Sequence, residues 1–116
     1  MTRGIRLFLE DILESIELIE SNTQGFMRED FERSPLVQDA VYRRVAIIGQ
    51  AVKSIPDDIR NRYAAVPWRD IAGTRDYIVH AYFKMDTELV WDIVSQRLTG
   101  LKSVVERILA DETGVV

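Results

Sequence analysis

The stretch IRLFLEDILESIELI, residues 5–19, decides the fold class that the sequence predicts. Its large apolar side chains recur at intervals of three or four residues, which is the spacing that lines one face of an α-helix. Charged residues fill the opposite face, and Asn22 to Gly25 ends the pattern. The apolar positions are Ile5, Phe8, Leu9, Ile12, Leu13, Ile16 and Ile19. We expect an amphipathic helix that buries this face against other helices.

A second long helix is predicted from Pro35 to about Ile55. Ser34 is a typical N-cap residue and Pro35 suits the first helical position. Pro56 then stops the helical pattern. A short turn over residues 26–33 is expected to connect the first two helices.

Asp57 and Asp58 are placed to start a short helix through Tyr63, and two longer helices follow it. Pro67 begins one that covers roughly 67–83, and Asp86 is placed to cap another, in which Gly100 is expected to introduce a kink. No segment alternates polar and apolar residues as a half-buried strand does. We therefore predict an all-α fold, an antiparallel bundle of four to five helices, as a single domain over residues 1–116.

Composition excludes several classes of protein. The chain has 116 residues and no cysteine, and no run of about 18 apolar residues suggests a membrane span. A disulfide framework and a thiolate metal site are therefore excluded, and the charged N-terminal segment is unlike a signal peptide, so a cytoplasmic protein is expected. The net charge of −4 disfavours a broad nucleic-acid-coating surface, but residues 53–84 hold six basic and four acidic groups. An anionic ligand is expected to prefer this part of the chain.

The segment TRDYIVHAYF, residues 74–83, places a charge where a core residue is expected. Arg75 falls in the middle of an apolar helical stripe formed with Trp68, Ile71 and Ile78. A guanidinium stays charged, and burying it without a partner costs several kcal/mol. Arg75 therefore needs a carboxylate, a phosphate or a second protein chain opposite it.

The groups around Arg75 suit chemistry on a phosphodiester without a metal ion. His80, the only histidine, is a general acid or base near neutral pH, and Arg75 is able to stabilise charge on phosphate oxygens. Asp76 precedes His80 by four residues and is placed to orient the imidazole, and Tyr82 adds a phenol on the stripe of Arg75. Cleavage of RNA by its own ribose hydroxyl needs both a base and an acid, and a symmetric dimer would supply a second histidine.

Spacing alone favours a structural alternative for the same residues. In that alternative Arg75 pairs with a glutamate of the first helix, and Asp76 pairs with Arg69 or Lys84. His80 is then a partly buried histidine with satisfied hydrogen bonds, because a lone histidine is usually structural.

The pattern R-x-x-x-x-H-x-Y, from Arg75 through His80 to Tyr82, resembles the signature of the HepT-like toxins of the HEPN superfamily. Longer blocks resemble the same family, and together they cover nearly the whole chain. These blocks are MREDFERSPLVQDAVYRRV (27–45), IIGQAVKSIP (47–56) and VPWRDIAGTRDYIVHAYFKMDTELVWDIV (66–94).

The resemblance implies a HEPN-like helical bundle that forms a homodimer, with the two motifs facing a shared cleft. It implies metal-independent RNA cleavage without a cofactor, with Arg75 and His80 as the catalytic pair and Asp76 in support. The protein would be the toxin of a type VII-like toxin–antitoxin system. Its partner would be an MntA-like minimal nucleotidyltransferase, which neutralises the toxin by transferring AMP onto Tyr82.

One position departs from the family pattern, which often has glutamate where this chain has Gln50. The departure leaves the partner of Arg75 open. Lys84 and Arg69 are further candidates for contact with RNA phosphate. Two alternatives to the ribonuclease remain: a non-catalytic nucleotide- or protein-binding module that pairs with a nucleotidyltransferase, and a structural dimer.

Overall fold

The computed structural model describes residues 2–80 and 86–112, and for residues 77–80 it describes the helical backbone alone. The described residues form helices and no strand, which confirms the all-α prediction. The elements are α1 (Arg3–Asn22), α2 (Arg28–Glu32), α3 (Pro35–Lys53), α4 (Asp57–Arg62), α5 (Trp68–His80), α6 (Thr87–Asp92), the π-helical segment η1 (Ile93–Arg97) and α7 (Leu98–Glu112).

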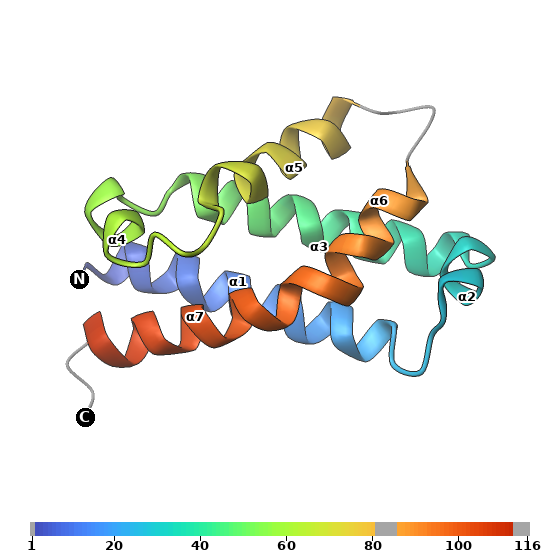
Figure 1. Ribbon diagram of the computed structural model, residues 1–116, viewed down its shortest axis with the longest axis horizontal. Helices are drawn as coiled ribbons and strands as arrows, with labels where there is room; N and C mark the ends of the chain where they lie inside the picture. The colour runs from blue at the N-terminus through green and yellow to red at the C-terminus, as the bar shows by residue number, and fades with distance from the viewer. Residues whose placement is uncertain (1, 81–85, 113–116) are drawn as a thin grey trace.

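The long helices form an antiparallel bundle in which α3 is central. Helix α3 packs along α1 on one side and along α5 on the other, and α1 also packs along α7. Figure 1 shows α1, α3, α5 and the α6–α7 rod running in alternating directions. The main packing partner of α5 is α3, so the position of the motif helix depends on the α3–α5 contact.

The apolar stripe of α1 is the base of the core. Leu9, Ile12, Ile16 and Ile19 are fully buried, as the periodicity of the sequence predicts. Burying each of these side chains stabilises the fold by about 1.5–3 kcal/mol. Phe31 of α2 is also fully buried, and α2 packs against the α6 end of the α6–α7 rod.

Contacts between aromatic rings fix this packing. The ring centroid of Phe31 lies 5.4 Å from that of Trp91 in α6 and 6.4 Å from that of Tyr42 in α3. The sequence predicts a turn over residues 26–33, and in the structure this segment contains the short helix α2. Its single fully buried side chain, Phe31, gives this short helix a place in the core.

The helix ends follow the sequence signals in part. The side chain of Asp86 accepts a hydrogen bond of 3.0 Å from the backbone N–H of Leu89, so it is the expected N-cap. Ser34 makes no such side-chain bond, and α3 begins with Pro35 at its first position. Helix α5 begins at Trp68 and is described to His80; the last part of the helix predicted over 67–83 lies outside the described residues.

The sequence predicts a kink at Gly100, and the structure places the irregularity of the α6–α7 rod before that residue. Gly100 lies inside the regular helix α7, and the irregularity of the last rod is the π-helical segment Ile93–Arg97. A π segment is a single wider turn inside an α-helix, and the apolar spacing did not predict it here. Among the described residues, no helix has the length and apolar character needed to cross a membrane.

Candidate active site

The close approach of α3 and α5 at Gly49 sets the position of Arg75. Gly49 is buried, and a Cβ atom added there would lie 3.1 Å from the backbone N and 3.2 Å from the Cα of Arg75, and closer still to its Cβ. A larger residue at this position would push the two helices apart. The backbone of Arg75 is therefore held directly against α3, which explains why it lies in an otherwise apolar stripe.

The guanidinium of Arg75 leaves this tight contact and finds a carboxylate. Its side chain is 34% exposed, and Nη1 donates a hydrogen bond of 3.3 Å to Oδ1 of Asp76. A carboxylate is thus the partner that Arg75 uses, but it comes from the next residue and not from a glutamate of α1. Gln50 is exposed, and its side chain makes no hydrogen bond with Arg75.

Lys53, the last residue of α3, is a member of this cluster that sequence reasoning missed. Its Nζ donates a hydrogen bond of 2.8 Å to the same Oδ1 atom of Asp76. The expectation that Asp76 pairs with Arg69 is therefore wrong, and Lys84, the other expected partner, lies outside the described residues. The available signal was weak: Lys53 lies one helical turn after Gly49, which is the contact point of the two helices.

The electrostatics of the cluster follow from these bonds. The hydrogen bond from Lys53 has the largest effect on the pKa of Asp76 and lowers it below its ordinary value. Desolvation opposes this lowering, and the hydrogen bond from Arg75 and the charges of both cations add to it. Asp76 is therefore ionised at neutral pH. Two cations around one carboxylate leave a net charge of +1, which suits the binding of an anion such as phosphate.

The remaining predicted site residues are placed only in part. His80 ends α5 one helical turn after Asp76, so the two positions share a flank of the helix. Arg69 is exposed on the same flank, two turns before Asp76. Tyr82 and Lys84 lie outside the described residues.

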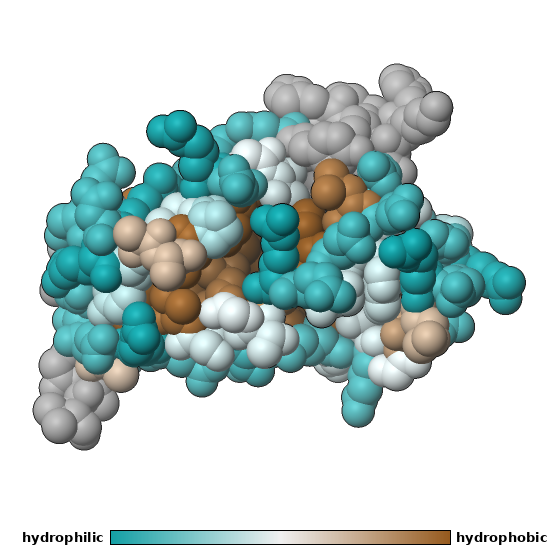
Figure 2. All heavy atoms as spheres, viewed as in Figure 1, coloured by the Kyte–Doolittle hydropathy of each residue, from teal (hydrophilic) through white to brown (hydrophobic). Residues whose placement is uncertain are grey.

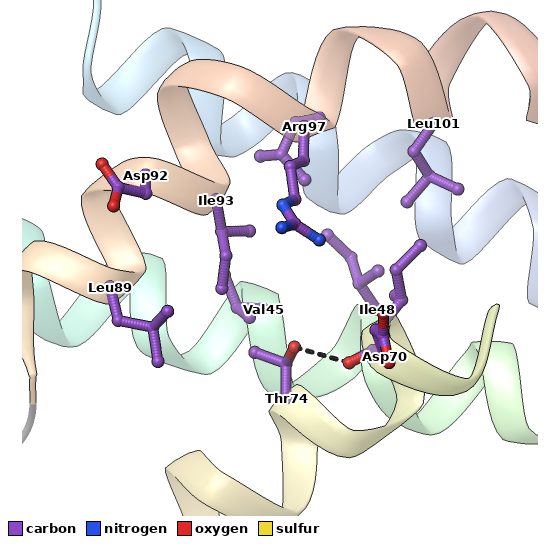
Figure 3. Close-up of a pocket in the computed structure, with 11 residues that line it drawn as sticks. Val45, Ile48, Asp70, Thr74, Leu89, Asp92, Ile93, Arg97 and Leu101 are labelled. Atoms are coloured by element: carbon purple, nitrogen blue, oxygen red, sulfur yellow. Dashed lines mark hydrogen bonds between the residues drawn. The ribbon is translucent and has the colours of Figure 1, made fainter. Parts of the chain in front are cut away.

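A second feature is an apolar cavity of about 340 Å³ on the opposite flank of α5. It lies between α3, α5 and the α6–α7 rod, where Figure 2 shows brown apolar atoms gathered at the surface. Figure 3 shows Arg97 of η1 extending into this space above Asp70 and Thr74. Arg75 and Asp76 do not line the cavity, so the charged cluster and the cavity are separate sites.

Fold and site together define a small helical protein with a cluster of two cations and one carboxylate one turn before its only histidine. Residues 12–108 match the family described as "Ribonuclease HepT-like". The chain belongs to this family, which confirms the resemblance carried by its R-x-x-x-x-H-x-Y motif.

Curated relatives agree with this assignment. The chain is 41% identical over 108 residues to a protein of Thermococcus cleftensis named "Probable ribonuclease HepT", with 93% of this chain and 98% of the relative covered. It is 39% identical over 111 residues to a protein of Methanocaldococcus jannaschii named "Gamma-glutamylcyclotransferase and putative RNase". That match covers 96% of this chain but spans half the length of the relative. No solved structure matches the chain.

Proposed function

We propose that the chain is a metal-independent endoribonuclease and the toxin of a toxin–antitoxin pair. Membership of the HepT-like ribonuclease family supports the enzyme class. The observation that carries the proposal is the cluster of Arg75, Asp76 and Lys53, which has a net positive charge one helical turn before His80. Such a cluster attracts a phosphodiester to a residue that transfers protons near neutral pH.

In the proposed reaction, the ribose 2′-oxygen attacks the adjacent phosphorus and the bond to the 5′-oxygen breaks. One His80 imidazole accepts the proton of the 2′-hydroxyl, and a second, protonated imidazole donates a proton to the leaving 5′-oxygen. Arg75 stabilises the negative charge that develops on the phosphate oxygens. Because each chain has a single histidine, the second one comes from the other subunit of a homodimer.

The charge of the cluster also supports a mechanism without a metal ion. Two cations contact the same oxygen of Asp76, at 2.8 Å from Lys53 and 3.3 Å from Arg75. A divalent cation would have to displace them and would be repelled by both. Arg75 takes the part that a metal ion plays in other nucleases, which is to neutralise charge on the phosphate.

The proposed antitoxin is an MntA-like nucleotidyltransferase that transfers AMP onto Tyr82. Tyr82 follows His80 by two residues, so an adenylate on its phenol would bring a negative phosphate to the end of the motif helix. That charge would compete with RNA for the cationic cluster. Arg69, exposed on the flank of Asp76, and Lys84 are proposed as further contacts for RNA phosphate.

The cavity beside Arg97 favours a second candidate, a non-catalytic module that binds a nucleotide or a protein. Its volume of about 340 Å³ and mostly apolar lining suit a small organic group. If this candidate is correct, the purified protein binds nucleotide or its nucleotidyltransferase, and loss of His80 changes no reaction.

The deciding experiment is cleavage of mixed cellular RNA by the purified protein in the presence of a chelator. Intact mass is measured first, to establish that no AMP is attached. The matched variant is His80→Ala, and its melting curve shows whether the fold is preserved. The proposal expects chelator-resistant cleavage by the wild type and none by a folded variant; equal behaviour of the two contradicts it.

A further inference from the structure

Lys53 contributes charge to the cluster, but no proton transfer or charge stabilisation in the reaction described above is assigned to it. It is the last residue of α3, whereas Arg75, Asp76 and His80 belong to α5. We propose that Lys53 is a positioning residue of the ribonuclease site, which holds Asp76 in place to orient His80 and keeps Arg75 available to the RNA phosphate. This inference rests on the proposed function.

Lys53 sets the net charge of the cluster. Arg75 and Asp76 alone form a neutral pair, in which the carboxylate would repel an approaching phosphate. Lys53 contacts the same Oδ1 atom, and at 2.8 Å its bond is shorter than the 3.3 Å bond from Arg75. The second cation restores a net charge of +1, so Asp76 is neutralised by Lys53 and Arg75 is free to turn toward the phosphate.

The two cations hold Asp76 through only one of its two carboxylate oxygens. Lys53 and Arg75 both bind Oδ1, and among the side chains that the structure describes, Oδ2 of Asp76 has no partner. His80 is four residues later, on the same flank of α5. A carboxylate fixed through one oxygen is suited to accept a hydrogen bond from an imidazole N–H through the other, which selects the tautomer of the ring.

Lys53 itself belongs to a helix end that is held in place by its neighbours. Arg60 donates a hydrogen bond of 2.6 Å from its guanidinium to the carbonyl oxygen of Val52, which stabilises the last turn of α3. Gly49, one turn before Lys53, holds α3 against α5 at Arg75. The lysine therefore extends from a helix end that is fixed on both sides of it, toward a carboxylate on the neighbouring helix.

The test compares Lys53→Met with Lys53→Arg and with a matched control, Lys102→Met. Lys102 also donates to a carboxylate on another helix, at 3.1 Å from Glu20, and its side chain is 31% exposed against 36% for Lys53. We expect Lys53→Met to lower kcat at least about tenfold, because oriented acid–base catalysis contributes about 10²–10⁴-fold. Lys53→Arg, which keeps the charge, is expected to restore most of the rate, and Lys102→Met to behave like the wild type.

Titration of the Asp76 carboxyl carbon by NMR gives a readout that does not depend on RNA cleavage. The groups that face Asp76 in the described part of the chain are Lys53 from α3 and Arg75 from α5. Lys53→Met is therefore expected to raise the pKa of Asp76 toward its ordinary value, while Lys102→Met leaves it unchanged. The pH–rate profile of Lys53→Met is expected to shift, since the orientation and charge around His80 change.

The outcomes separate the two proposals. If the wild type cuts RNA, His80→Ala does not, and Lys53→Met matches the wild type in rate and pH profile, the positioning role is wrong and the ribonuclease stands. If the wild type and His80→Ala are equally inactive, the proposed function is wrong and the role of Lys53 falls with it. A slow Lys53→Met that melts with the wild type and is rescued by arginine supports the inference.

Discussion

At the residue scale, Gly49 and Arg75 form a close contact between the two helices of the site. The contact leaves no room for a side chain on α3 at this position. The long arginine side chain extends to Asp76, which also binds Lys53. A glycine thus determines where the charge is placed. The same residues explain how an arginine occupies an apolar stripe without being buried unpaired.

Replacement of Gly49 tests this contact. Gly49→Ala is expected to lower the free energy of unfolding by about 1–3 kcal/mol, because the new methyl group collides with the backbone and Cβ of Arg75. The matched control is Gly73→Ala in α5, where an added Cβ meets nothing within 4 Å. The control is expected to be neutral or to stabilise by up to about 1 kcal/mol, since alanine favours helix. Urea unfolding measures both, and equal effects of the two variants would contradict the account.

The pH dependence of the free energy of unfolding tests the ion pairs of Asp76. Because Lys53 and then Arg75 lower its pKa, Asp76 contributes to stability above the pKa of an unfolded aspartate, and this contribution is lost as the pH falls through its lower folded value. Asp76→Asn is expected to lower the free energy of unfolding slightly at neutral pH, since the pair is half exposed, and to make no difference in strong acid. Urea unfolding at both conditions checks this; a difference that persists in acid would exclude the ion pair as its cause.

At the element scale, the sequence predicts helices better than their contacts. Apolar spacing indicates α1, α3, α5 and α7 because each buries one face, and Asp86 marks the start of the last rod. The bond between Lys53 and Asp76 joins residues 23 apart on different helices, and no local pattern predicts it. The motif indicated Arg75 and His80 as candidate site residues. Lys53 could be identified only from its contact with Asp76 in the structure.

The end of α7 is tied to the segment after α4 by a side-chain hydrogen bond. The hydroxyl of Tyr63 donates to Oδ2 of Asp111 at 3.0 Å, and burial, then this bond, raises the pKa of Tyr63. Tyr63→Phe is expected to lower the free energy of unfolding by about 1 kcal/mol, because it removes the donor and keeps the ring. Asp111→Asn keeps an acceptor and is expected to cost less. Thermal melting compares the two, and an unchanged Tyr63→Phe would show that the tie contributes nothing.

At the scale of the whole molecule, one chain is expected to be insufficient for catalysis. The proposed reaction uses a base and an acid, and each chain has one histidine. Activity per chain is therefore expected to fall on dilution below the dissociation constant of the dimer, while the helical circular dichroism of the subunits persists. Light scattering measures the mass in parallel; full activity of a monomer would contradict the shared site.

The most direct test of the central claim is RNA cleavage by the unmodified protein, with chelator present and His80→Ala beside it. The account predicts that the wild type cuts RNA under these conditions and that the variant, with an unchanged melting temperature, does not. Cleavage that persists in the folded variant, or that disappears from the wild type with chelator, would contradict a metal-independent site at Arg75 and His80.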